Sequence, residues 1–183
     1  FFLLLLLSFS IHINQLNKIS SRYLIPDASR ELGAIAISLA ETGQFSDPYM
    51  MQTGPTAHLP PIIPGIIGMI YRWFGLTAQA GYLSKLLVIT NGSMLYAALP
   101  WLSRKLGLTR QAGLIGGIAG ILLMEWHGHG EHLTGIAMGL IMVAFLRRWK
   151  KNRINVMGSI ILGLGIGVSF HIQPAILPVV LGC

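Results

Sequence analysis

Long apolar runs recur along the whole chain and are separated by short polar segments. The runs cover residues 1–13, 62–74, 82–102, 112–124, 133–146 and 156–170. Apolar segments of this length satisfy their backbone hydrogen bonds internally when they are helical, as a lipid environment requires. We therefore predict a helix over each of the six runs, followed by a short apolar stretch from residue 174.

The composition indicates that these helices lie in lipid. Hydrophobic residues make up 53% of the 183 residues and charged residues only 10%, whereas a soluble domain has about 25% charged residues. At about 20 residues for each membrane crossing, the apolar residues suffice for several spans. The predicted fold class is all-α, a polytopic transmembrane helical bundle.

Basic residues gather in two short segments between apolar runs. The first holds Arg104, Lys105 and Arg110, and the second holds Arg147, Arg148, Lys150, Lys151 and Arg153. This distribution is typical of cytoplasmic loops, so the net charge of +7 reflects membrane topology and no nucleic-acid partner is predicted. The predicted location is the bacterial inner membrane, with multiple passes.

The two ends of the sequence are apolar. Phe1 opens directly into the first run, and the last run is too short to cross a bilayer. The first run lacks the basic start and the small-residue cleavage site of a signal peptide. We interpret residues 1–183 as a single N-terminal transmembrane portion of a larger protein that begins within a truncated first span.

Glycines are spaced for close packing of helices in the run at 112–124. The pairs are Gly113-x-x-Gly116 and Gly116-x-x-x-Gly120. Small residues at such spacings let the backbones of neighbouring membrane helices approach each other. We predict that these pairs mark the contact face of this helix.

Residues 14–60 form a polar segment that we predict to be an external loop. Pro26 is predicted to start a helix, with Asp27 near its positive end, and Gly43 to end it. One apolar stripe is formed by Leu32, Ile35, Ala36 and Leu39, whereas Glu31 and Ser38 fall off it. The pattern is typical of an amphipathic helix on a membrane surface, followed by a connector rich in proline and glycine.

The sidedness of the later loops depends on the run at 62–74. If both basic segments are cytoplasmic and every run crosses, residues 124–132 and the loop at 14–60 lie on opposite sides. The run at 62–74 is short for a crossing and typical of a re-entrant or interfacial segment. We favour the topology in which this run does not cross and both polar regions are external.

The order of several short motifs resembles a known family. The motifs are E-T-G-Q-F-S-D-P at 41–48, P-T-A-H-L-P-P-I-I-P-G at 55–65, W-F-G at 73–75, S-R-K-L-G at 103–107 and R-R-W-K-K-N-R at 147–153. Together they resemble the N-terminal part of the GT-C superfamily of membrane glycosyltransferases. The branch with protein O-mannosyltransferases and lipid A aminoarabinose transferases is the most similar. The T-G-x-F segment followed by P-P-x-x-P is the most specific part.

The resemblance implies a reaction and two acidic positions. Such enzymes move a sugar from a polyprenyl-phosphate donor to an acceptor at the external face, so membrane lipid and the lipid-linked donor are the expected partners. The first acidic position of the family matches Asp27, and the second matches Glu131. The W-H-G-H-G-E-H segment around Glu131 is richer in histidine than the family pattern.

The residue types of the external loop suit this chemistry. The carboxylate of Asp27 can take the proton of an acceptor hydroxyl, although a helix cap is the alternative. Arg30 can bind a phosphate oxygen or be a solvated surface residue, and Lys85 and His58 are further phosphate candidates. Glu31, Glu41 and Asp47 are interpreted as solvated loop charges.

The histidine-rich segment leaves three interpretations open. His127, His129, Glu131 and His132 could bind a divalent metal, because imidazole and carboxylate both suit such ions. Their spacing matches no known metal motif, so no metal ligand is assigned and the cofactor is unknown. The alternatives are substrate hydrogen bonding, through His129 and His132 in particular, and an interfacial polar loop.

Two other classes of protein remain as alternatives to an enzyme. A transporter carries ionisable residues in mid-span and internal repeats, whereas here the charges lie at run ends and in loops. A non-catalytic membrane assembly protein has no use for the carboxylates of the external loop. The sequence favours a glycosyltransferase with Asp27 and Glu131 as catalytic residues.

Overall fold

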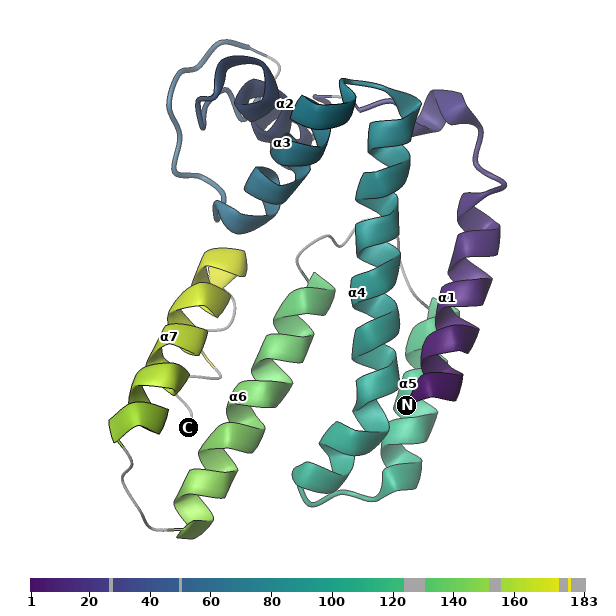
Figure 1. The fold of residues 1–183 in the computed structure, drawn as a ribbon, viewed down its shortest axis with the longest axis vertical. Helices are drawn as coiled ribbons and strands as arrows, with labels where there is room; N and C mark the ends of the chain where they lie inside the picture. Colours follow the sequence, from purple (N-terminus) through teal and green to yellow (C-terminus); the bar gives the residue numbers. More distant parts are fainter. Residues whose placement is uncertain (27, 50, 124–130, 152–155, 175–177, 179–183) are drawn as a thin grey trace. The chain divides into compact units, whose positions relative to one another are not determined.

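Helices are the regular secondary structure of the described part of the chain, and non-helical segments connect them (Figure 1). The computed structural model describes residues 1–26, 28–49, 51–123, 131–151, 156–174 and 178. Its elements are α1 (Phe2–Leu16), the 3-10 helix η1 (Ser21–Leu24), α2 (Glu31–Thr42), α3 (Ile62–Phe74), α4 (Ala78–Lys105), α5 (Arg110–Leu123), α6 (Glu131–Lys151) and α7 (Val156–Ile172). All six apolar runs are helical over the residues that the structure describes, which confirms the all-α prediction.

The length and composition of each helix decide whether it could cross a membrane. Among the described residues, α4 is the one helix that is long and apolar enough to cross a membrane. Helices α1, α3, α5 and α7 are apolar but shorter. The predicted multi-pass bundle therefore stays a prediction.

The chain divides into two compact units. One consists of residues 12–87, and the other consists of residues 1–11 with 88–183. Helices α1 and α4 are continuous through the boundary and contribute one part to each unit.

In the unit of residues 12–87, α2 and α3 pack side by side and are joined by a long connector (Figure 1). Gly68 of α3 permits the contact, because a Cβ atom there would lie 3.0 Å from Leu39 Cβ of α2. Ile35 and Ile67 are fully buried. The polar end of α1 is fixed in the same unit, where Tyr82 Oη donates a hydrogen bond of 2.9 Å to Asn17 Oδ1.

Helix α2 begins later than predicted. It starts at Glu31, and Arg30 before it has extended backbone angles (φ −126°, ψ 146°). The buried residues of the helix begin at Ala34, so its packing favours a start near Glu31 over one at Pro26. Its end is as predicted, because Gly43 adopts the left-handed conformation and donates its N–H to Leu39 O. Ser38, predicted to lie off the apolar stripe, is buried.

In the other unit, glycines place α5 directly against α4. A Cβ atom at Gly113 would collide with Leu99 O, and one at Gly117 would lie 2.7 Å from Tyr96 O. Gly116 is exposed, and its nearest neighbour would be 3.8 Å away. Gly116 therefore lies off the contact face, contrary to the prediction, whereas Gly113 and Gly120 lie on it as predicted, because a Cβ atom at Gly120 would collide with the Tyr96 ring. Gly117 replaces Gly116 in the contact with α4.

Several small and polar residues are buried in this unit, whereas many large apolar side chains of α1 and α5 are exposed. Ser8 of α1 and Ser93 of α4 are both fully buried, and Ser93 Oγ donates a hydrogen bond of 2.9 Å to Ser8 Oγ. The exposed apolar residues of α1 and α5 include Phe2, Leu3, Leu6, Leu114, Ile115, Ile118, Leu122 and Leu123. A core of Leu4, Ala97 and Ile121 joins α1, α4 and α5.

Helices α6 and α7 complete the same unit. Gly135 and Gly139 of α6 lie against Leu95 and Leu102 of α4. Helix α7 packs on α6, where Gly158 lies near the Arg148 side chain. Most large apolar side chains of α7 are exposed.

Candidate functional site

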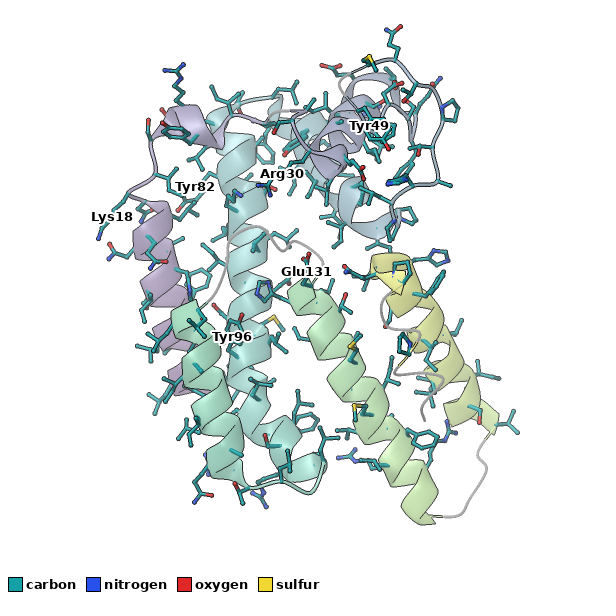
Figure 2. The ribbon with its side chains drawn as sticks, turned by 180° about the vertical axis from the view of Figure 1, so that it is seen from behind. Lys18, Arg30, Tyr49, Tyr82, Tyr96 and Glu131 are labelled. Atoms are coloured by element: carbon teal, nitrogen blue, oxygen red, sulfur yellow. The ribbon has the colours of Figure 1, made fainter. Side chains whose placement is uncertain are left out.

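An open pocket lies where the chain enters α2. Its volume is about 510 Å³, which is in the range of small-molecule sites. Two segments of the chain line it, one before and at the start of α2 and the other in the connector to α3. The lining residues are Ala28, Ser29, Arg30, Glu31, Pro48 and Tyr49. Figure 2 labels Arg30 and Tyr49, which mark these two segments.

Asp47 shapes the connector so that Tyr49 reaches the pocket. Its carboxylate accepts hydrogen bonds of 2.8 Å from the backbone N–H groups of Thr53 and Gly54. Ser46 Oγ donates a third hydrogen bond of 2.9 Å to it. Asp47 has a positive φ of 56°, a conformation that Asp tolerates better than most residues. The bonds from Gly54, Ser46 and Thr53 lower the pKa of Asp47, because they favour its ionised form.

The base of this loop is closed and attached to α2. The N–H of Asp47 donates to Gly54 O at 3.0 Å, and the N–H of Thr56 donates to Phe45 O at 3.1 Å. Ser46 Oγ lies 2.7 Å from Ser38 Oγ in a buried hydrogen bond. Residues 48 and 49 are therefore held beside the first turn of α2 by the fold itself.

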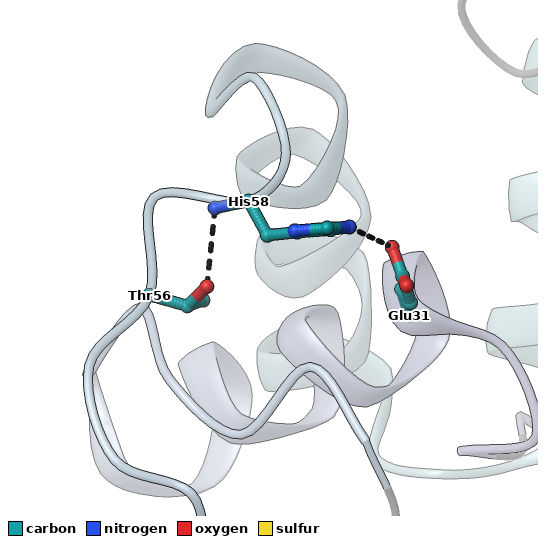
Figure 3. Close-up of polar contacts among 3 residues, drawn as sticks. All are labelled: Glu31, Thr56 and His58. Carbon is teal, nitrogen blue, oxygen red and sulfur yellow. Dashed lines mark hydrogen bonds and ion pairs between the residues drawn. The ribbon is translucent and has the colours of Figure 1, made fainter.

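His58 contacts Glu31, which lines the pocket. Its Nε2 lies 3.2 Å from Glu31 Oε2, and its backbone N–H donates to Thr56 Oγ1 at 3.1 Å (Figure 3). The imidazole also neighbours Tyr49, with ring centroids 6.3 Å apart at an angle of 57°. Glu31, His58 and Tyr49 thus form a continuous group of a carboxylate, an imidazole and an aromatic ring.

These groups can bind a ligand that is anionic at one point and carries hydroxyls elsewhere. Arg30 supplies guanidinium donors, which suit phosphate oxygens. The N-terminus of α2 adds free backbone N–H groups and the positive end of its dipole. Glu31 accepts hydrogen bonds, and His58 can donate them to or accept them from hydroxyl groups.

The structure brings together two of the substrate-binding residues that the sequence predicts. Arg30 lines the pocket, and His58 reaches it through Glu31. Lys85 is half-buried in α4 and does not line the pocket. Asp27 lies outside the described residues, and Ala28, which follows it in the sequence, lines the pocket.

The remaining predicted residues belong to the other unit or lie outside the described part. Glu131 is the exposed first residue of α6. His132 is 8% exposed, and its Nε2 lies 3.2 Å from Tyr96 Oη in a hydrogen bond. His127 and His129 lie outside the described residues. The described residues contain no group of three His, Cys, Asp or Glu side chains that could hold a metal ion.

Glu31 and Asp47, predicted to be solvated loop charges, have polar partners in the structure: Glu31 pairs with His58, and Asp47 accepts the hydrogen bonds that order the loop. Tyr49 lines the pocket and is not predicted from the sequence. The adjacent Asp47 and Pro48, with Gly54 seven residues after Asp47, are a turn signal that could have indicated an ordered loop and a fixed aromatic residue.

Comparison of the chain with protein-family models, curated proteins and solved structures finds no match.

Proposed function

We propose that the protein is a membrane glycosyltransferase that moves a sugar from a polyprenyl-phosphate donor to an external acceptor. The observation that carries this proposal is the pocket at the start of α2. There, Arg30 and Glu31 follow shortly after Asp27 in the sequence, and Glu31 pairs with His58 of the connector. A lipid-linked sugar presents a phosphate, hydroxyl groups and an apolar sugar face, and the pocket has a chemical counterpart for each.

The inverted distribution of side chains supports a membrane-embedded enzyme. Helix α5 buries Gly113, Gly117 and Ile121 while exposing its other leucines and isoleucines. In water this arrangement loses the hydrophobic contribution of those side chains. In lipid the outward apolar groups are solvated by acyl chains, and inward small residues let helices pack closely. A multi-pass protein of a bacterial inner membrane and its lipid-linked substrate would both lie in the bilayer.

In the proposed reaction the pocket binds the donor phosphate and orients the sugar. The acceptor hydroxyl oxygen bonds to the anomeric carbon while the bond from that carbon to the phosphate oxygen breaks. The bonding electron pair leaves with the phosphate, whose charge Arg30 and the α2 N-terminus stabilise. Asp27 takes the acceptor proton as general base.

The other predicted residues have supporting roles in this proposal. Glu131 stays the second acidic position that the resemblance implies, and Lys85, His129 and His132 stay predicted substrate contacts. Glu31 and His58 orient the sugar through its hydroxyl groups.

The proposal is tested by sugar transfer with the full-length protein in lipid vesicles. Polyprenyl phosphates that carry mannose, glucose or aminoarabinose serve as donors. We expect Asp27→Asn to lower the rate of transfer about 100-fold or more, because the amide cannot accept the proton. Glu41→Gln is the matched control, since Glu41 is an exposed carboxylate at the opposite end of α2, and it should retain the wild-type rate. Full activity of Asp27→Asn removes Asp27 from the mechanism, and no transfer by the wild-type protein from any donor contradicts the function.

A further inference from the structure

We infer that Tyr49 is the sugar-binding residue of this pocket and packs its ring against the sugar of the lipid-linked donor. The inference rests on the proposed function. It adds a division of the pocket into a sugar end at Tyr49, His58 and Glu31 and a phosphate end at Arg30.

The first argument for a sugar contact at Tyr49 is the group of side chains around it. The Tyr49 ring neighbours the His58 imidazole, and His58 Nε2 contacts the Glu31 carboxylate at 3.2 Å. A pyranose ring has apolar C–H faces and hydroxyl groups around its edge. An aromatic face next to a paired imidazole and carboxylate complements both surfaces, because the ring covers C–H groups while the polar pair bonds hydroxyls.

The second argument for a sugar contact is that the Tyr49 ring is exposed. About half of the side chain is exposed (49%) in a loop that is ordered by its own hydrogen bonds. A sugar that covers this ring removes apolar surface from water, which favours binding. Since the Asp47 carboxylate already fixes the loop, little ordering of the chain is needed on binding.

Arg30 is chemically suited to the other part of the ligand. Its guanidinium provides several donors for phosphate oxygens, and it stands directly before the N-terminus of α2. The two ends of the pocket therefore make separable contributions, one that depends on the sugar and one that depends on the phosphate.

The experiment measures binding of two probes to the full-length protein in lipid vesicles. One is the polyprenyl-phosphate sugar that binds most tightly among the mannose, glucose and aminoarabinose donors, and the other is polyprenyl phosphate without sugar. We expect Tyr49→Ala to weaken binding of the sugar-bearing probe about three- to tenfold and leave the sugar-free probe unchanged. Tyr49→Phe should bind both as the wild type does. Arg30→Ala should weaken both probes.

Tyr23→Ala is the matched control, because Tyr23 is 80% exposed in the same unit and outside the pocket. It should leave both affinities unchanged. If Tyr49→Ala changes neither affinity, or lowers both equally, the inference is wrong, while the proposed function stands on the wild-type binding. If the wild-type protein binds neither probe, both fail.

Discussion

At the scale of single residues, one carboxylate decides the form of the candidate site. Asp47 accepts three hydrogen bonds and thereby sets the place of Tyr49. The sequence predicts Arg30 and His58 as phosphate contacts, because their side chains have the donors that phosphate needs; Arg30 lines the pocket, and His58 contacts Glu31 at its edge. The sequence could not identify the Glu31–His58 pair, since these residues are far apart in the chain and only the packing of the connector brings them together.

The ionisation of Asp47 should therefore control the order of the loop. A pKa below the ordinary value of 3.8 means that the carboxylate stabilises the fold above about pH 4 and that this contribution is lost as the pH falls through the pKa of the folded state. We expect the amide resonance of Gly54 to titrate with a midpoint below 3.8. NMR of glycine-labelled protein in lipid nanodiscs measures this midpoint.

Asp47→Asn is the control for this titration, because it removes the charge and leaves an oxygen acceptor. Its Gly54 resonance should show no transition in the same pH range. A wild-type midpoint at or above 3.8 would contradict the role given to these hydrogen bonds.

At the scale of elements, apolar runs determine where helices form, but neighbours determine which face packs. The six helices follow from the sequence, because each run is long enough and apolar enough to require internal hydrogen bonds. The face of α5 does not, since Gly113, Gly116 and Gly117 are equally small and only α4 selects among them. The predicted start of α2 at Pro26 is wrong for a similar reason, because packing against neighbours sets the start and the buried residues of α2 begin at Ala34.

The glycines of α5 offer a matched pair of substitutions. Gly113→Ala should destabilise the protein by about 1–3 kcal/mol, because the added methyl group meets the α4 backbone and forces the helices apart. Gly116→Ala should be neutral or slightly stabilising, since its nearest neighbour would be 3.8 Å away. Unfolding in mixed micelles with increasing denaturing detergent measures both. Equal effects of the two substitutions would contradict the α4–α5 contact.

At the scale of the whole molecule, helix length bears on how the chain crosses the membrane. Helix α3 has 13 residues, about 20 Å at about 1.5 Å per residue, which is short of the hydrocarbon core of about 30 Å. Helix α4 has 28 residues and exceeds that thickness. These two lengths agree with the predicted topology, in which α3 stays on the side of the predicted external loop and α4 crosses to the first basic segment.

Labelling of introduced cysteines tests this topology in a Cys183→Ser background. Gln52→Cys in the connector and Leu108→Cys in the turn after α4 are both exposed. We expect a membrane-impermeant maleimide added outside to label Gln52→Cys and to label Leu108→Cys only after the membrane is opened. Ile115→Cys, exposed on α5, should react with an apolar reagent and not with the impermeant one. Labelling of all three from outside would contradict a membrane-embedded bundle.

Because the base of the loop at 46–55 is closed by hydrogen bonds, residues at its tip can be substituted without disturbing the rest of the fold. The bridge between Ser46 and Pro55 and the bonds of Asp47 hold the two ends of the loop together without help from residue 49. A substitution at the tip therefore leaves the α2–α3 pair and its hydrogen bonds in place. If the proposed function holds, a mutation at this one exposed position changes donor choice at little cost to folding.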